Sequence, residues 1–260
     1  MPAPRRGVLK PPARRIVRRS RLLRGAPPPP GPTFVQQATG SSGAASTTLS
    51  AVFGVAPTSG NLLVLLMAGD KNTGAMTLAG WTITYELLST SVSLYLAWKV
   101  SDGTETTVSP SWATSSAAGN MAWVGEYSDI AAGTWTLLQS ASSITDETAV
   151  ATKATGTTAA TSADGIGIAA AAVDSNTSVT TVDPWGSSYA IRHSSTGGGG
   201  RGAVFVAEKL EPASMAATST FTFTGTADQT SAAIGVWAKV VGGAPPARAP
   251  ALTSQYGGYY

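Results

Sequence analysis

The sequence predicts an all-β fold: a jelly-roll-like antiparallel β-sandwich with an extended basic N-terminal arm. Three observations support this prediction. After residue 32, short apolar runs follow one another, and turn residues separate them at a spacing of about 8–12 residues, as in sandwiches and barrels. Several of these runs alternate with a period of two, which is typical of strands. The best helical candidate, Ile166–Val173, is short and contains Gly167, so we predict a strand there as well.

The first 32 residues differ from the rest of the chain. They carry nine cationic side chains and no Asp or Glu, whereas the remaining residues carry eight Lys and Arg against fourteen Asp and Glu. They end in Pro27–Pro32, which predicts a stiff polyproline II spacer of about 3.1 Å per residue. A segment of this composition does not fold alone. We therefore expect this arm to bind a negatively charged partner.

Residues 33–241 are predicted to form the β-sandwich domain, and residues 242–260 a tail rich in Gly, Pro and Tyr. The predicted strands are Thr33–Ala38, Thr47–Val55, Leu62–Ala68, Trp81–Leu88, Ser91–Val100, Glu105–Pro110, Met121–Tyr127, Thr134–Ser140, Asp164–Val173, Ser187–Arg192, Gly202–Leu210, Ala217–Thr224 and Ala232–Val241. Alternation predicts a shared face for each of three sets: Leu94, Leu96, Trp98 and Val100; Phe221 and Phe223; and Ile234 and Val236.

Composition excludes some classes of site. The chain has no cysteine, so disulfides and thiolate metal sites are excluded. The apolar run at residues 62–68 is far below the ~20 residues that a membrane helix needs, and it predicts a buried strand. The arm has only pairs of apolar residues, whereas a signal peptide needs a run of about 7–15. We expect neither a signal peptide nor a membrane anchor.

The sequence offers no convincing catalytic or cofactor site. His193 is the single histidine, and no Gly-x-Ser-x-Gly motif accompanies it, so we expect a loop histidine rather than part of a Ser-His-Asp triad. The glycine run at residues 197–202 lacks the Lys-Ser/Thr of a phosphate-binding loop. The oxygen-rich segments 70–74 and 174–176 lack a complete calcium loop and are explained by turn chemistry. We predict no enzyme activity, no metal and no cofactor.

Carboxylates and tryptophans receive structural assignments. Glu86, Glu126 and Glu208 lie in predicted strands, and we expect them on the solvent face or in salt bridges between subunits, because a glycosidase pair would need two carboxylates converging. The tryptophans that fit core positions are Trp81, Trp98, Trp123 and Trp237. Those that follow turns, and that we predict as surface aromatics, are Trp112, Trp135 and Trp185, together with the tail residues Tyr256, Tyr259 and Tyr260.

The arm has two interpretations. Arginines at this density neutralise phosphates and give salt-sensitive binding of nucleic acid. Alternatively, the arm lies across an acidic protein lattice, with its apolar residues as anchors; these anchors and the many prolines favour protein binding slightly. The predicted partner-binding residues are Arg5, Arg6, Lys10, Arg14, Arg15, Ile16, Val17, Arg18, Arg19, Arg21, Leu22, Leu23 and Arg24.

Several short motifs of the domain resemble a module of virion structural proteins of tailed bacteriophages, of the kind found on actinobacteriophage head decoration or minor tail proteins. The motifs are Ala56–Val64, Gly80–Trp81, Ala97–Val100, Gly103–Thr106 and Glu126–Ile130, and the resemblance covers about residues 33–241. It implies a jelly-roll-type β-sandwich on the outside of a head or tail, assembled in the host cytoplasm. Its motifs are packing and turn signatures, and the arm is not part of it.

The resemblance and the arm together predict a non-enzymatic virion structural protein. We expect capsid decoration or cementing, or attachment at the neck or tail, with the arm anchored on an acidic protein lattice. The expected partners are major capsid, connector or tail proteins, and the chain itself is expected to form a trimer or another ring. Two alternatives remain: a jelly-roll capsid protein whose arm binds packaged nucleic acid, and a carbohydrate-binding adhesin module on the tail.

Overall fold

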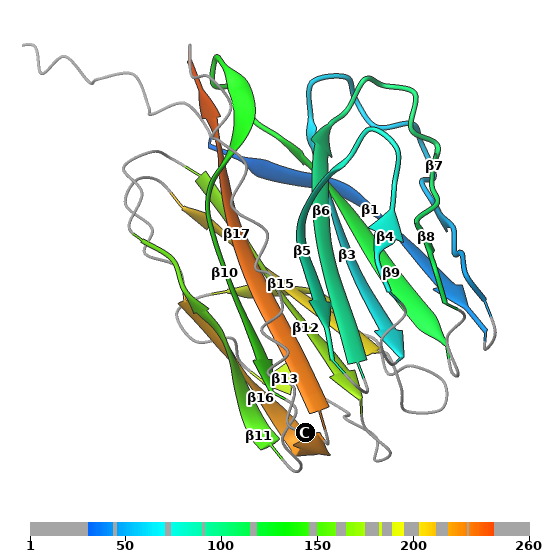
Figure 1. Ribbon diagram of the computed structural model, residues 1–260. Helices are drawn as coiled ribbons and strands as arrows, with labels where there is room; N and C mark the ends of the chain where they lie inside the picture. The colour runs from blue at the N-terminus through cyan, green and yellow to red at the C-terminus, as the bar shows by residue number, and fades with distance from the viewer. Residues whose placement is uncertain are drawn as a thin grey trace, which may run out of the picture.

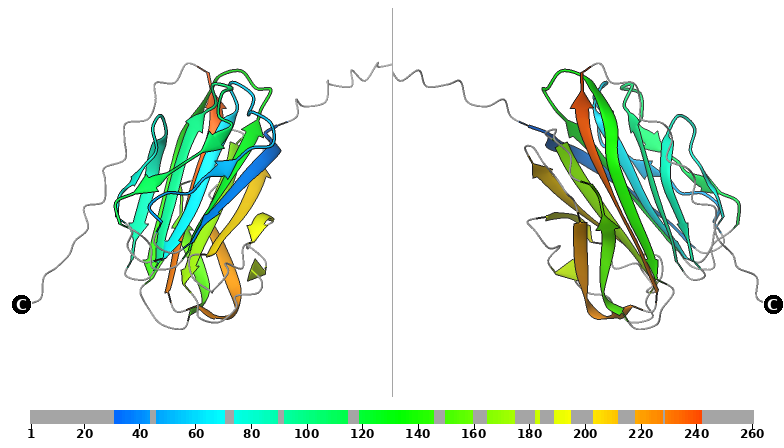
Figure 2. Two further views of the ribbon diagram at one scale, coloured as in Figure 1. Left: turned by 90° about the vertical axis from the view of Figure 1, so that its right-hand side faces the viewer. Right: turned by 60° about the vertical axis from the view of Figure 1, so that its left-hand side comes forward.

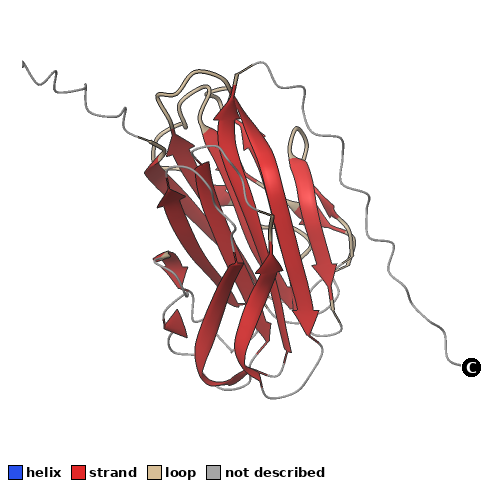
Figure 3. Ribbon diagram, turned by 90° about the vertical axis from the view of Figure 1, so that its left-hand side faces the viewer, coloured by secondary structure: helices blue, strands red, loops and turns tan. Residues whose placement is uncertain are grey.

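A computed structural model describes residues 31–43, 46–70, 74–89, 92–114, 119–145, 150–159, 165–174, 182–183, 189–194, 203–211, 218–227 and 229–241. Within these ranges the chain forms antiparallel β-strands joined by turns, and no helix is present in them (Figure 3). The prediction of an all-β antiparallel sandwich is confirmed. Residues 1–30 of the arm and 242–260 of the tail lie outside the described ranges.

Two five-stranded sheets form the centre of the molecule (Figure 1). The first sheet has the order β1 (Thr33–Ser42), β9 (Asn120–Ser128), β3 (Leu62–Asp70), β6 (Val92–Val100) and β5 (Thr82–Leu88). The second sheet has the order β10 (Thr134–Thr145), β17 (Gln229–Val240), β12 (Gly165–Asp174), β15 (Ala203–Glu211) and β14 (Ala190–Ser194). Neighbouring strands are antiparallel throughout.

The main core lies between the two sheets. It is built from alternate residues of the central strands, such as Leu62, Val64 and Leu66 of β3 and Ile166 and Ile168 of β12. On β6 the predicted alternation is confirmed: Leu94, Leu96, Trp98 and Val100 belong to this core, and Tyr95 and Ala97 lie on the other face. Burying such side chains is the main favourable term in folding.

Each sheet is also covered on its outer face (Figure 2). Four short strands accompany the first sheet: β2 (Ala51–Val52) with β7 (Thr107–Val108), and β4 (Met76–Thr77) with β8 (Ser111–Trp112). A three-stranded sheet accompanies the second: β11 (Val150–Thr157), β16 (Thr218–Ala227) and β13 (Val182–Asp183). Further apolar clusters fill both outer faces. Because both faces are covered, residues 62–68 are fully buried, which explains their unbroken apolar run.

The two halves of the described chain, residues 33–128 and 134–240, repeat one topology. If the interrupted pair β7 and β8 counts as one strand, each half has eight strands, with the order 1-8-3-6-5 in the large sheet and 2-7-4 in the outer layer. In a jelly roll the first strand lies beside the last, and the third and sixth strands follow in the same sheet. Both large sheets have this order. The molecule is therefore two jelly-roll-like units that pack through their large sheets.

The register supports this repeat. Leu62 pairs with Tyr127 and Val100 in the first half, and Ile166 pairs with Trp237 and Leu210 in the second. The pairing of the first strand with the last shifts once in each half: after Phe34 in β1 and after Leu137 in β10. Both shifts lie directly beside these paired residues, Tyr127 and Trp237. A second matching shift occurs in β5 and β14.

A glycine and a tryptophan pack together in the last strand of each half. A Cβ on Gly125 would lie 2.2 Å from the ring of Trp123, and a Cβ on Gly235 would lie 2.2 Å from the ring of Trp237. Both tryptophans are fully buried in the main core. Each ring thus occupies the space that a Cβ would take, which only glycine permits. Gly125 and Gly235 occupy equivalent register positions, since they pair with Val64 and Ile168.

The predicted strands agree with the structure in the large sheets and differ in the outer layers. The predicted strand Thr47–Val55 is reduced to Ala51–Val52, and Glu105–Pro110 to Thr107–Val108. The strands β4, β8, β11 and β13 have no counterpart in the prediction. Three of these four, β4, β8 and β13, are only two residues long, so no alternation marks them. The side chains of Phe221 and Phe223 lie outside the description, whereas Ile234 and Val236 do share a face.

Candidate functional site

An ion pair of the second sheet lies at one edge of the sandwich, where it contacts the first sheet. Glu208 lies on β15 beside Val206, and its side chain is 1% exposed. The guanidinium of Arg192, on the neighbouring strand β14, donates a hydrogen bond to the Glu208 carboxylate. Arg192 also lies over the ring of Phe34 on β1, with Cζ 4.4 Å from the ring centre. Phe34 in turn makes an edge contact with Tyr127 of β9, at 5.5 Å between ring centres.

The electrostatics of this cluster favour fixed charges rather than proton transfer. Burial, followed by the negative charge of Glu208, raises the pKa of Tyr127 well above its usual value, so the phenol stays protonated. The hydrogen bond with Glu208 raises the pKa of Arg192 further. The Tyr127 hydroxyl and the Glu208 carboxylate face each other, although neither that hydroxyl nor Oε2 of Glu208 makes a hydrogen bond of standard geometry among the described residues. The arrangement holds a charge pair at the seam of the two units and offers no exposed nucleophile.

His193 follows Arg192 on β14. Burial lowers its pKa, which favours the neutral imidazole at neutral pH. Its Nε2 has no hydrogen-bond partner in the part of the chain that the structure describes. A general base in a triad needs both a nucleophile and an orienting carboxylate within hydrogen-bonding reach. The histidine lies on a strand rather than in the loop that the sequence predicted, and no such pair is seen around it in the described ranges.

The expectation for Glu126 and Glu208 was wrong. Glu126 is fully buried, and its carboxylate accepts hydrogen bonds from Gln36 (2.6 Å), Asn61 (2.6 Å) and the backbone N–H of Thr58 (2.7 Å). It therefore holds the turn before β3 against β1 and β9. Glu208 is buried too, and its salt bridge lies within the chain. Glu86 is exposed and accepts from the backbone N–H of Met76 (2.7 Å), which fits the solvent face that we expected.

The two buried carboxylates do not form a glycosidase pair. Glu208 faces the main core, beside Tyr127 of β9. Glu126 is the preceding residue of β9, and successive side chains of a strand point to opposite faces of the sheet. Glu126 and Glu208 therefore lie on opposite sides of the first sheet.

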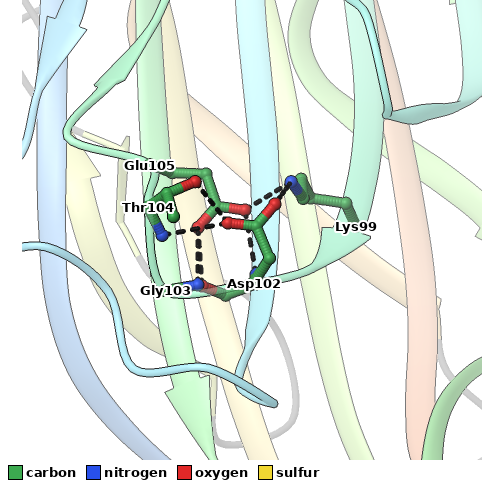
Figure 4. Close-up of polar contacts among 6 residues, drawn as sticks. Lys99, Asp102, Gly103, Thr104 and Glu105 are labelled. Atoms are coloured by element: carbon green, nitrogen blue, oxygen red, sulfur yellow. Dashed lines mark hydrogen bonds and ion pairs between the residues drawn. The ribbon is translucent and has the colours of Figure 1, made fainter.

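A second charge cluster forms the turn after β6 (Figure 4). Lys99 makes salt bridges with Asp102 (3.2 Å between Nζ and Oδ2) and with Glu105. Ser101 donates to Glu105 (2.7 Å), and the backbone N–H of Thr104 donates to Asp102 (2.9 Å). Gly103 takes a positive φ of 91°, a conformation that favours glycine. The motif Gly103–Thr106 is thus explained by turn geometry.

Contacts within this turn shift the pKa values of its charged residues. Hydrogen bonds from the side chain and backbone of Thr104, and then from Lys99, lower the pKa of Asp102 to about 2. Burial alone would raise the pKa of Glu105, but hydrogen bonds from Lys99, Ser101 and the Asp102 backbone outweigh it and lower this pKa to about 2. Burial also disfavours the charge of Lys99, yet its bonds to Glu105 and Asp102 raise its pKa overall. All three groups are therefore charged at neutral pH.

Two of the predicted surface aromatics are buried, which corrects that prediction. Trp112 is 4% exposed, and its indole N–H donates to the backbone oxygen of Ser46 (3.1 Å). Trp135 is 2% exposed and belongs to the main core, with the ammonium of Lys239 5.8 Å from its ring centre. Both follow turns in the sequence, yet Trp112 packs into the outer apolar cluster of the first sheet and Trp135 into the core between the two large sheets.

Of the four tryptophans predicted for the core, Trp123 and Trp237 are fully buried, and Trp81 and Trp98 are partly buried against the clusters. The remaining predicted site residues lie outside the described ranges. They are the arm residues Arg5–Arg24 together with Trp185, Tyr256, Tyr259 and Tyr260.

The described residues show neither a cluster of metal ligands nor a membrane-spanning helix. Among the described residues, no group of three or more His, Cys, Asp or Glu side chains could hold a metal ion. The same residues include no helix long and apolar enough to cross a membrane. Of the calcium-like segments, residues 71–73 and 175–176 lie outside the description.

Comparisons with known proteins gave no match for this chain. No protein-family model matches it. Searches of the curated proteins and of the solved structures also gave no match.

Proposed function

We propose that the chain is a non-enzymatic structural protein of a bacteriophage virion, and that it decorates or cements the capsid or attaches at the neck or tail. The observation that carries this proposal is the charge contrast within the chain. Residues 1–32 hold nine cations and no carboxylate, while the rest of the chain has an excess of six carboxylates over Lys and Arg. A segment of this composition binds something negative, and the arm is joined to a body that has a different composition.

The charges in the body support a scaffolding role. Glu126, Glu208 and Glu105 are each used in turns or seams, through hydrogen bonds and ion pairs within the chain. Two of these residues, Glu105 and Glu126, lie in the motifs that resemble phage virion modules, and Glu126 meets the turn at Thr58 and Asn61 in another of them. Such motifs fix packing rather than chemistry, as expected of a structural module.

In this proposal the arm lies in an acidic groove of a capsid, connector or tail protein. Each exposed salt bridge contributes about 0–1 kcal/mol. Nine cations, the apolar anchors Ile16, Val17, Leu22 and Leu23, and repetition over a symmetric particle together give avidity. A trimer or another closed ring of this chain fits such a site.

The two alternatives differ in what the arm or the body touches. In a nucleic-acid-packaging protein the arm would bind phosphates, with strong salt dependence. A carbohydrate-binding adhesin needs exposed aromatic side chains, and the burial of Trp112 and Trp135 removes two of the three tryptophans proposed for it. We therefore rank the adhesin last.

The test compares four forms of the protein for binding to genome-emptied particles and, separately, to double-stranded DNA. They are the full chain, a chain without residues 1–32, a variant with the nine cations of the arm replaced by Ser, and a variant with the four apolar anchors replaced by Ser. The proposal expects the full chain to bind emptied particles, and expects binding to be lost without the arm and weakened in both Ser variants. Binding of the full chain to DNA alone would refute it and support the packaging role.

A further inference from the structure

The arm and the tail join the described body at the same end. Thr33, the first residue of β1, pairs with Ser128 at the end of β9. Val240, the last residue of β17, pairs with Thr134 at the start of β10. Only residues 129–133 connect Ser128 to Thr134, and a chain of that length spans at most about 20 Å. Lys239 donates to the backbone oxygen of Asp129 (2.5 Å) and thereby ties this connection to β17.

We call this part of the molecule the terminal end: the strand ends at Thr33, Ser128, Thr134 and Val240 with the connection 129–133. The ribbon views agree that the start of β1 and the end of β17 lie at one end of the sandwich (Figure 1 and Figure 2). The far end, where β10 finishes at Thr145 opposite Thr230 of β17, is the natural reference surface.

Exposed apolar side chains are concentrated at the terminal end. Eight large apolar residues of the described chain are at least 36% exposed. Three of them lie within two residues of the strand ends just named: Val35, Ile130 and Val241. Two more are near in space: the backbone oxygen of Val55 accepts from Gln36 of β1 (3.0 Å), and Leu210 pairs with Ile166, which pairs with Trp237 of β17. Two of these are among the most exposed, Ile130 at 69% and Val241 at 77%, and they flank the connection and the start of the tail. Exposed apolar side chains gathered in one region mark an interaction surface.

The polar groups of this end are compatible with a contact. Val100 pairs with Leu62, which pairs with Tyr127, so the turn after β6 also lies at the terminal end. Lys99 pairs with both of its carboxylates, Asp102 and Glu105, which leaves one net negative charge on the turn. The attraction to an acidic partner therefore comes from the nine cations of the arm, and the body contributes apolar contact.

We propose that the terminal end is the surface through which the body sits on its partner, and that this partner is an acidic protein surface with apolar sites. This inference depends on the proposed function and extends it by naming the contacting face. The nine cations of the arm set the charge of the partner, and the point where the arm joins β1 sets the face that lies next to it. The far end of the body then points away from the particle.

The test uses the full chain and genome-emptied particles. In one variant, Ile130→Ser and Val241→Ser are combined; neutral Ser removes apolar contact without adding charge. The matched control is Ile144→Ser, an exposed apolar residue (42%) on β10 at the far end. A chain without residues 1–32 is measured in parallel. Thermal midpoints check that every form is folded.

We expect the terminal-end variant to bind about tenfold more weakly than the full chain, which corresponds to about 1.4 kcal/mol. The far-end control should bind as the full chain does. If the terminal-end variant also binds unchanged while loss of the arm abolishes binding, the proposed function stands and this inference is overturned. An equal or larger loss in the far-end control overturns it too. If the chain without the arm binds as well as the full chain, the proposed function itself fails.

Discussion

The two halves of the chain share a topology but join each other through different chemistry. Trp98 of β6 and Glu208 of β15 occupy equivalent positions, since they pair with Val64 and Ile168. In the first half the position holds an aromatic side chain packed against the core. In the second it holds a buried carboxylate paired with Arg192. Both units therefore share one strand topology, but the side chains at the interface between them differ.

The two edges of the sandwich show the same difference. On one edge, Arg192 of β14 lies over Phe34 of β1. On the other, the hydroxyl of Tyr85 on β5 donates to Ser140 of β10 (3.0 Å). A buried ion pair adds little net stability, but breaking it by removing one partner is costly. We therefore expect single substitutions at the two edges to lower the free energy of unfolding by different amounts. Four experiments test how far the two units are alike, and two of them compare the edges directly.

The largest effect is expected at the paired glycines. Gly125→Ala and Gly235→Ala each place a Cβ against a buried tryptophan ring, so each should lower the free energy of unfolding by about 3 kcal/mol. Gly54→Ala is the control, because nothing lies within 4 Å of its added Cβ. Urea unfolding monitored by circular dichroism measures all three. If only one of the two variants, Gly125→Ala or Gly235→Ala, lowers the free energy of unfolding, the two units do not share this packing.

The next effect is expected at the charged edge. Arg192→Ala leaves Glu208 buried without its cation, and because Arg192 itself is 31% exposed, we expect a loss of about 2–3 kcal/mol in the same assay. The double variant Arg192→Leu with Glu208→Leu should recover most of this loss, since it removes both charges. A single variant as stable as the unmodified protein would contradict the description of the seam.

A smaller effect is expected at the opposite edge. Tyr85→Phe deletes only the hydroxyl that donates to Ser140, so the expected loss is about 0.5–1.5 kcal/mol. Ser140→Ala in the same background should add little more, because the two groups form one hydrogen bond. The asymmetry of the edges would be disproved if Tyr85→Phe cost as much as Arg192→Ala.

The smallest effect concerns pH and the turn after β6. The pKa of Glu105 is lowered to about 2 in the folded protein from 4.5, so its contribution is complete above about pH 4.5 and is lost as pH falls towards 2. We expect Glu105→Gln to lower stability by no more than about 1 kcal/mol at pH 7. The difference from the unmodified protein should vanish near pH 2. A difference that stays constant from pH 7 to pH 2 would assign it to packing rather than charge.

Much of the central fold could be predicted from the sequence, because the strands of the large sheets carry strong apolar patterns. Residues 94–100 alternate, and residues 62–68 form an unbroken apolar run, and both are strands. The outer strands could not be predicted in this way, since pairs such as Met76–Thr77 are too short to show a period. The repeat of the two halves was also missed, because its signal is a register shared by Gly125 and Gly235 rather than a shared motif.

The charged side chains were harder to place. The sequence places Glu126 and Glu208 in predicted strands but does not show which groups their carboxylates meet, and carboxylates are rarely buried without partners. Their partners are distant in the sequence: Asn61 lies 65 residues from Glu126, and Arg192 reaches Glu208 only across two paired strands. The turns before Trp112 and Trp135 predict surface positions. Trp112 instead lies on β8, a short strand of the outer layer that the sequence does not predict, and Trp135 on β10 faces the core between the two large sheets.

The most direct test of the account is amide hydrogen exchange of the full chain, free and bound to genome-emptied particles. The account predicts new protection in residues 1–32 together with residues 33–36, 128–135 and 239–241 at the terminal end. Residues 142–145 at the far end should exchange at the same rate in both states. Protection at the far end, or protection of the body without the arm, would contradict the claim that a basic arm anchors a two-unit β-sandwich by its terminal end.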